Sequence, residues 1–170
     1  MTVEIRMASP SDVSGIYRLI QRYVELGRLL PRSIDDIDKQ LSSFLVSEEG
    51  SNLSGCVSLE IFTNELGEVR SLAVDPTYSR LGHGRMLVDS VETKARILGL
   101  DRLIALTYVP EFFEKLGFKI TDMKTLPEKV FGVCVVCPNF YNCDEIAMVK
   151  HLSLHNTKRL SSPTIIQPNK

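Results

Sequence analysis

The sequence has no tryptophan, few cysteines and almost no net charge. Its 20 Lys+Arg balance 21 Asp+Glu, so charge predicts neither nucleic acid nor an acidic membrane surface as a partner. No apolar run is long enough to span a bilayer, and the N-terminal stretch MTVEIRMASPSD lacks the apolar segment of a signal peptide. We therefore expect a cytoplasmic protein without a membrane partner.

Three of the four cysteines, Cys134, Cys137 and Cys143, lie close together in the sequence. The C-x-x-C spacing is typical of a metal knuckle, but a structural zinc site takes four ligands, and Asp144 or His151 would have to supply the fourth. An apolar loop packed on the core explains the same pattern, because free cysteine is often buried. We therefore expect reduced thiols and no metal.

The apolar periodicity predicts one mixed α/β domain, of the α+β kind, over residues 1–152. A polar, proline-bearing tail over residues 153–170 is expected to be disordered. The expected strands are Val3–Met7, Phe44–Val46, Leu53–Phe62, Glu68–Val74, Leu103–Leu106, Phe118–Ile120 and Glu145–Val149, and the expected helices cover 13–24, 33–41, Gly84–Leu98 and Pro110–Leu116.

Residues 71–87, SLAVDPTYSRLGHGRML, place a strand, a glycine-containing loop and the start of a helix in that order. Gly82 and Gly84 let backbone amides approach a ligand, and the first N–H groups of a helix are unpaired, so the segment suits a pyrophosphate. It lacks the Gly-Lys-Ser/Thr of a P-loop and the third glycine and ribose acid of a dinucleotide fingerprint. Taken alone, the loop has two interpretations: it binds an anion, or it is an ordinary turn.

Together with EFFEKLGF at residues 111–118, this segment resembles the GNAT family of acetyl-CoA-dependent N-acetyltransferases. The resemblance implies a mixed central sheet flanked by helices in a single domain, with acetyl-CoA as co-substrate. GNAT proteins are often dimers, so a homodimer is compatible with it. The implied coenzyme A contacts are Leu72, Ala73 and Val74 along the pantetheine arm, the loop residues Ser79, Arg80, Leu81, Gly82, His83, Gly84 and Arg85 at the pyrophosphate, and Phe112 and Phe113.

Two positions depart from the family pattern. Ser79 stands where the family has Gln or Arg, although Arg80 and Arg85 still supply positive charge. Phe113 stands where many members have a tyrosine that protonates the coenzyme A sulfur. Tyr108 is our substitute candidate for that acid, and His83 is interpreted as a loop residue that contributes only its amide.

The segments GRLLPRS, GEVRSLAVDP and LPEKVFGVCVVCPNFYNCDEIAMVK resemble the short N-acetylglutamate synthases, which implies L-glutamate as the acceptor. Its two carboxylates require cationic donors, for which Arg32, Arg70 and Lys129 are candidates. Each has an alternative interpretation: Arg70 as a solvated residue on the polar face of its strand, and Arg32 and Lys129 as surface charges.

Acetylation requires a neutral amine, so a base must remove a proton from the ammonium group. Glu68 is our candidate base, directly or through a water, and its alternative is a solvent-facing glutamate at the end of a turn. A strand amide near Leu72–Val74 is the candidate donor to the developing oxyanion. Transfer to another amino acid or small amine, and a non-catalytic acyl-CoA-binding sensor, remain alternative functions.

Overall fold

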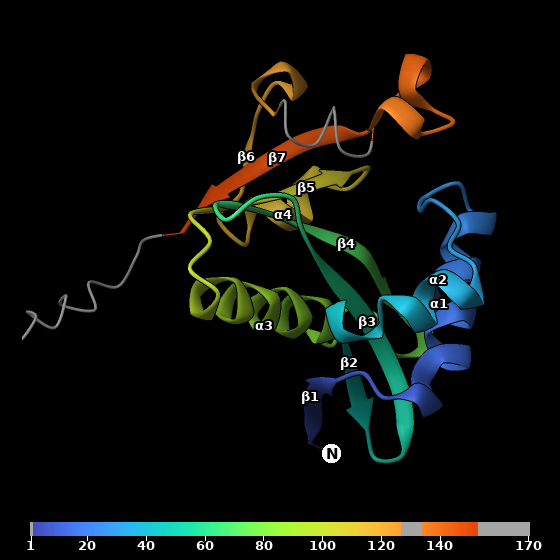
Figure 1. The fold of residues 1–170 in the computed structure, drawn as a ribbon. Coiled ribbons are helices and arrows are strands. Elements are labelled where there is room, and N and C mark those ends of the chain that lie inside the picture. Colours follow the sequence, from blue (N-terminus) through green and yellow to red (C-terminus); the bar gives the residue numbers. More distant parts are fainter. Residues whose placement is uncertain (1, 127–133, 153–170) are drawn as a thin grey trace, which may run out of the picture.

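The structure, a computed structural model, describes residues 2–126 and 134–152 and contains one seven-stranded sheet with the order β1-β2-β3-β4-β5-β7-β6 (Figure 1). Neighbouring strands are antiparallel except for the parallel pair β4 and β5. The strands are β1 Val3–Met7, β2 Phe44–Glu49, β3 Asn52–Ile61, β4 Leu66–Val74, β5 Arg102–Thr107, β6 Lys119–Ile120 and β7 Ile146–His151. The α-helices are α1 Val13–Glu25, α2 Ile34–Lys39, α3 His83–Ile97 and α4 Pro110–Glu114, and the 3₁₀ turns are η1 Pro10–Asp12, η2 Leu41–Ser43, η3 Pro76–Tyr78, η4 Met123–Thr125, η5 Cys134–Val136 and η6 Phe140–Asn142.

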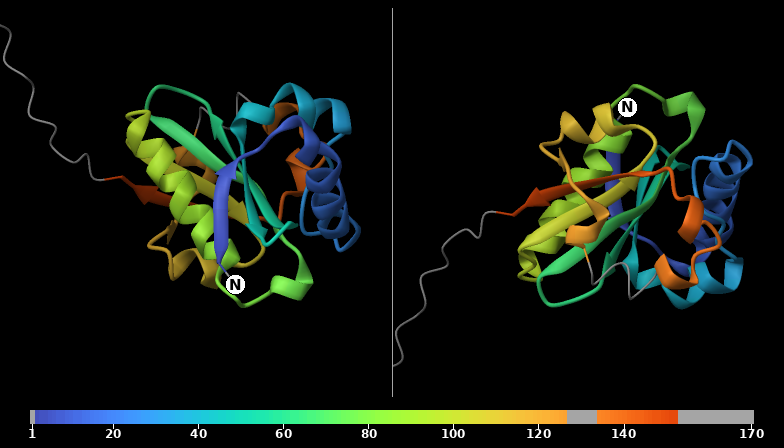
Figure 2. Two further views of the ribbon diagram at one scale, coloured as in Figure 1. Left: turned by 90° about the horizontal axis from the view of Figure 1, so that it is seen from below. Right: turned by 90° about the horizontal axis from the view of Figure 1, so that it is seen from above.

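Helices cover both faces of the sheet, with α3 on one side and α1 and α2 on the other (Figure 2). Alternating residues of one strand therefore enter different cores, because successive side chains point to opposite faces. On β2, Leu45 packs in the cluster that contains the buried face of α3, while Phe44 and Val46 pack in the cluster that contains α1. This two-sided burial explains why the strands have nearly continuous apolar runs.

Strands β4 and β5 pair over only three residues each, Leu66–Glu68 with Arg102–Ile104. Beyond Glu68, β4 contains a bulge. Arg70 pairs with Ser58 and Ala73 pairs with Cys56, so β4 has one residue more than β3 between these two pairs. Ser71 sits in the bulge with a φ of 52°, a left-handed conformation that is uncommon for a residue other than glycine. The bulge and the short pairing produce an opening beside the middle of β4.

The predicted single-domain mixed α/β architecture and the order of its elements are confirmed. Some boundaries differ: β4 begins at Leu66 rather than Glu68, and β2 continues to Glu49 rather than ending at Val46. The predicted tail 153–170 lies outside the described residues. None of the helices within 2–126 and 134–152 is long and apolar enough to cross a membrane.

Candidate active site

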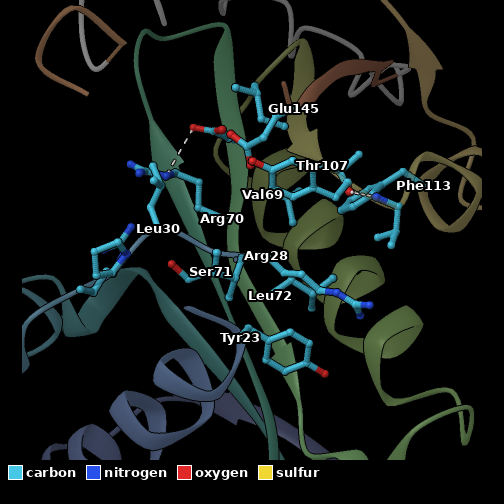
Figure 3. A pocket seen from close by; sticks show the side chains of 17 residues that line it. Tyr23, Arg28, Leu30, Val69, Arg70, Ser71, Leu72, Thr107, Phe113 and Glu145 are labelled. Carbon is cyan, nitrogen blue, oxygen red and sulfur yellow. Dashed lines mark hydrogen bonds and ion pairs between the residues drawn. The ribbon is translucent and has the colours of Figure 1, made fainter. Parts of the chain in front are cut away.

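A cavity of about 170 Å³ opens where β4 and β5 diverge, and three segments line it (Figure 3). The end of α1 and the loop after it contribute Tyr23 and the run Arg28–Arg32, β4 contributes the run Glu68–Leu72, and the end of β5 with its following turn contributes Leu106–Val109, joined by Phe113 and Glu145. In a regular strand only alternate residues face one side, so five consecutive lining residues reflect the bulge in β4. The predicted candidates Arg32, Glu68, Arg70, Leu72, Tyr108 and Phe113 all line this one cavity.

Glu68 is a buried carboxylate in the wall of the cavity, with only 2% of its surface exposed. It is the third residue of β4 and lies at the level where β4 pairs with both neighbours, opposite Glu60 on β3 and Ile104 on β5. Its Oε2 lies 3.7 Å from Nε of Arg70. The alternative interpretation of Glu68 as a solvent-facing residue is therefore wrong, because the strand begins two residues earlier than expected.

Arg70 and Arg32 are also removed from solvent, with side chains 20% and 10% exposed. Their alternative interpretations as solvated charges are wrong, because both side chains line the cavity and pair with carboxylates. Burial lowers the pKa of Arg70, but the carboxylates of Glu68 and Glu60 outweigh burial and raise it. Burial, reinforced by the charge of Arg70, lowers the pKa of Arg32. The cavity thus holds two cations that share the carboxylate of Glu60.

Tyr108 follows β5 and donates a hydrogen bond from its hydroxyl to Oδ1 of Asp144 at 2.7 Å. This bond raises the pKa of Tyr108 above its ordinary value, so the phenol keeps its proton at neutral pH. The bond also ties the turn after β5 to the segment that leads into β7. Tyr108 therefore lies at the cavity, with its proton directed toward Asp144.

The glycine loop lies at the N-terminus of α3, next to the cavity-forming end of β4. Gly82 is the N-cap of α3 and has a φ of 89°, which glycine adopts without a steric penalty. Within the described residues, the amides of Gly82, His83, Gly84 and Arg85 donate no backbone hydrogen bond, as expected at a helix start. Arg80 also has a positive φ, of 65°. These amides and the helix dipole make an anion-binding site geometrically reasonable.

The two sequence motifs of the resemblance meet in space at Gly84. A Cβ at this glycine would lie 3.4 Å from Cζ of Phe112 and 3.7 Å from Cγ2 of Val74. Phe112 in turn packs edge-on against Phe113, which packs edge-on against Phe118. Phe113 is buried and lines the cavity, so its ring is a packing element at the cavity wall.

The interpretation of His83 as a loop residue is wrong, since His83 is the first residue of α3 and only 1% exposed. Its Nδ1 lies 2.8 Å from Oγ of Ser54, which itself bonds to the backbone and hydroxyl oxygens of Ser47. Its Nε2 lies 3.4 Å from Oε2 of Glu49. A buried imidazole needs such partners, and here they anchor the start of α3 to β2 and β3.

The remaining predicted coenzyme A contacts, in β4 and in the glycine loop, range from buried to exposed. Ala73 is buried in the cluster on the α1 side, while the carbonyl of Val74 accepts a hydrogen bond from Tyr23 at 2.7 Å. Ser79 and Leu81 are exposed, and Arg85 is exposed and pairs with Asp89 one turn along α3. The departure at Ser79 thus falls on a solvent-facing position of the loop.

The segment between β6 and β7 contains the predicted substrate ligand Lys129 and the three clustered cysteines. Lys129 lies outside the described residues. Cys134 and Cys137 are half-buried and Cys143 is exposed, and none of them is in a disulfide. Within 2–126 and 134–152, no three His, Cys, Asp or Glu side chains gather as a metal site would require.

Sequence reasoning missed several residues of the site. Glu60 on β3 accepts hydrogen bonds from both cavity arginines, but the sequence analysis identified only the strand that contains it. Glu145 and Arg28 line the cavity from loops, and long-range placement of loops has no local sequence signal. The bulge at Ser71 lacks the glycine that usually indicates one.

The sequence model of the acetyltransferase (GNAT) family matches residues 13–118. An uncharacterized N-acetyltransferase of Chlorobaculum tepidum is 34% identical over 148 residues, which cover 87% of this chain and 96% of that protein. The chain therefore belongs to the GNAT family of acetyltransferases.

Two other relatives are larger proteins, and a third is of similar length. The amino-acid acetyltransferase of Neisseria meningitidis is 38% identical over 128 residues, which cover 74% of this chain but 29% of that protein. The N-acetylglutamate synthase of Neisseria gonorrhoeae, solved with coenzyme A and N-acetyl-glutamate, superposes with a TM-score of 0.79 at 30% identity over 89% of this chain and 35% of that one. Rv2747 from Mycobacterium tuberculosis, solved with CoA and NLQ, gives a TM-score of 0.76 at 27% identity and covers 88% of this chain and 99% of that one.

Proposed function

We propose that this protein transfers the acetyl group of acetyl-CoA to the α-amino group of L-glutamate in a ternary complex. The observation that carries the proposal is the buried Glu68 beside Arg70, with Arg32 in the same cavity. An α-amino acid has an ammonium and a carboxylate on one carbon. The neighbouring carboxylate of Glu68 and guanidinium of Arg70 complement these two charges. The second carboxylate of glutamate then suits Arg32.

The comparisons support the choice of substrates. The solved N-acetylglutamate synthase of Neisseria gonorrhoeae holds coenzyme A and N-acetyl-glutamate, and the Neisseria meningitidis relative is an amino-acid acetyltransferase. This chain spans about a third or less of either protein, so their whole activities are not carried over. Only the acetylation reaction, with acetyl-CoA and L-glutamate as substrates, is proposed for the cavity described above.

We assign the coenzyme to the glycine loop and the exposed part of β4. The amides from Arg80 to Arg85, with the dipole of α3 behind them, would bind the pyrophosphate. Leu72–Val74 would run beside the pantetheine arm, and Phe112 and Phe113 would support the loop and the cavity wall. Acetyl-CoA, when bound, supplies the acetyl group as a thioester, which has a thiolate as its leaving group.

The residues of the chain would then perform three tasks. Glu68 accepts the proton of the bound ammonium, directly or through a water, which produces the neutral amine that attacks. The backbone N–H of Leu72, at the bulge of β4, donates to the thioester oxygen as negative charge develops on it. Tyr108 is the candidate acid for the thiolate, but it would have to release its hydrogen bond to Asp144 to act. A thiol pKa near 8.5 lets a thiolate leave with little help.

A turnover assay with acetyl-CoA and a panel of amino acids and small amines, monitored by free-thiol release, tests this proposal. We expect release with L-glutamate and little with lysine or spermidine, because a cationic acceptor would meet Arg32 and Arg70. Release with another amine instead would assign a different acceptor. Tight coenzyme A binding without any release would favour a non-catalytic acyl-CoA-binding module, for which Phe113 and Ser79 are the supporting departures.

Arg70→Ala provides a sharper test of the acceptor site. It should raise the KM for glutamate by on the order of tenfold or more, because a charge-assisted pair to the substrate is lost, and leave the KM for acetyl-CoA nearly unchanged. Arg22→Ala is a suitable control, since Arg22 forms an exposed ion pair with Asp75 outside the cavity lining. Unchanged glutamate kinetics in Arg70→Ala would remove this residue from the acceptor site.

A further inference from the structure

The carboxylate of Glu60 lies between the two arginines of the cavity. Its Oε2 is 2.5 Å from Nη1 of Arg70 and 3.4 Å from Nη2 of Arg32. Glu60 is on β3, directly opposite Glu68 in the register, and is outside the set of described residues that line the cavity. It therefore contacts both guanidinium groups from the neighbouring strand, without itself belonging to the cavity lining.

The carboxylate of Glu60 offsets the repulsion between the two arginines of the site. Arg32 and Arg70 are largely removed from water, and each is a like charge in the surroundings of the other; the proximity of Arg70 contributes to the lowered pKa of Arg32. Two partly buried cations repel and would turn apart unless a carboxylate bridges them. Glu60 is the residue whose single oxygen meets both.

The remaining contacts limit how the two guanidinium groups can turn. Arg32 also donates from Nη1 to Oε1 of Gln40 at 2.9 Å, and its guanidinium lies 5.4 Å from the ring centre of Phe44. Arg70 lies between Glu60 and Glu68. A guanidinium has five N–H donors in a fixed plane, so these contacts still leave donors on each arginine for a ligand.

We propose that Glu60 is a positioning residue that sets the spacing and orientation of Arg32 and Arg70 for the carboxylates of the acceptor. Counted without the proposed base Glu68, the two arginines and Glu60 carry a net charge of +1, and the carboxylate of Glu60 offsets the repulsion between the two guanidinium groups. The inference rests on the proposed function, because it concerns the amino-acid site of the same reaction. It adds that the selectivity for an acidic acceptor depends on a residue that does not touch it.

Glu60→Gln tests the proposal, because it keeps the shape of the side chain and removes its charge. We expect the KM for the amino-acid acceptor to rise on the order of tenfold, the loss of about one well-placed charge-assisted bond, while kcat and the KM for acetyl-CoA change by less than about threefold. Glu60→Asp keeps the charge on a shorter side chain and should recover part of the loss.

Glu92→Gln is the matched control. Glu92 is on α3 and, like Glu60, accepts hydrogen bonds from two cations, Arg96 at 2.7 Å and Lys150, so its loss breaks comparable ion pairs away from the cavity. It should reduce thermal stability without changing the KM for the acceptor. The proposal is overturned if Glu60→Gln keeps a KM within about twofold of the wild type, or if kcat and both KM values deteriorate together as they do after general structural damage.

Wild-type measurements separate this inference from the proposed function. The kinetic comparison uses whichever amino acid the wild type acetylates, and calorimetric binding of glutarate probes the arginines without an amine. If the wild type acetylates glutamate and Glu60→Gln behaves identically, only the positioning role fails. If the wild type acetylates no amino acid but binds glutarate, and Glu60→Gln weakens that binding about tenfold, the positioning role stands and glutamate acetylation fails. If the wild type neither acetylates an amino acid nor binds glutarate, both fail.

Discussion

At the scale of single residues, the site is a short stretch of β4 in which charge alternates in sign. Glu68 and Arg70 are two apart, so they share one face of the strand, and their side chains meet at 3.7 Å. The bulge then presents Ser71 and Leu72 to the same cavity. One strand thus presents a carboxylate, a guanidinium and a bulged backbone to the cavity within five consecutive residues.

Glu68→Gln should lower kcat by about 10²–10⁴, the usual contribution of a positioned general base. The wild-type rate should level off once Glu68 is ionised, whereas the residual rate of the variant should keep rising with pH because only free neutral amine then reacts. The measurement is kcat as a function of pH at saturating substrates.

Glu65→Gln provides the control for this experiment, since Glu65 is exposed on the turn just before β4. A Glu68→Gln enzyme with a wild-type rate across the pH range would exclude Glu68 as the base. A rise in the KM for glutamate alone would instead make it a binding residue.

At the scale of elements, the N-cap of α3 is a glycine, Gly82, in a left-handed backbone conformation. Gly82 has a φ of 89°, and no atom lies within 4 Å of a Cβ placed on it, so only backbone strain opposes a larger residue there. The following residue, His83, is fixed to β2 and β3 through Ser54 and Glu49. The loop thus combines a glycine in a left-handed conformation with a histidine that is anchored to two strands.

Gly82→Ala should cost about 1–2 kcal/mol of stability, the penalty of a left-handed conformation for an L-residue, and should weaken acetyl-CoA binding. Gly99→Ala is the matched control, because Gly99 follows the other end of α3 with a φ of 79° and equally open surroundings. Both variants should lower the unfolding free energy measured in urea. Only Gly82→Ala should raise the Kd for acetyl-CoA in calorimetry, and equal Kd values would separate the loop from the coenzyme.

The elements themselves could be predicted from the sequence because their signals are local. Apolar alternation and helical spacing identified every long strand and helix, and Pro110 and Gly117 bounded α4 closely. The contacts of Glu60 with Arg32 and Arg70 could not be predicted, because they depend on the register between β3 and β4 and on a loop. His83 was misinterpreted for the same kind of reason: its partners Ser54 and Glu49 come from strands far away in the sequence.

At the scale of the whole molecule, the sheet has two parts that are joined by the short β4–β5 pairing. The opening between them forms the cavity, so the geometry of the site depends on keeping the N-terminal layer in place beside it. Arg6 on β1 contributes to this, since it pairs with Asp12 of η1 at 2.7 Å and with Glu48 of β2 at 2.7 Å. One guanidinium therefore connects the edge strand, the start of α1 and the neighbouring strand.

This connection predicts a pH dependence of stability. The hydrogen bond from Arg6 lowers the pKa of Asp12 to about 2, below its value in an unfolded chain. A depressed carboxyl pKa stabilises the fold above the unfolded pKa, and this contribution is lost as the pH falls toward the folded pKa. Asp12→Asn should therefore cost about 1–3 kcal/mol near neutral pH, and the difference from the wild type should shrink between about pH 4 and pH 2.

Urea unfolding of both proteins at several pH values measures this difference. Asp35→Asn is the control, because Asp35 pairs with Lys39 on the exposed surface of α2, and such pairs contribute little. A difference that stays constant down to the lowest pH would mean that Asp12 acts through its shape and hydrogen bonds to Ser9 rather than its charge. A loss that disappears with acid would instead assign the anchoring of the N-terminal layer to the Arg6 ion pairs, and with it the support of the cavity wall formed by the end of α1.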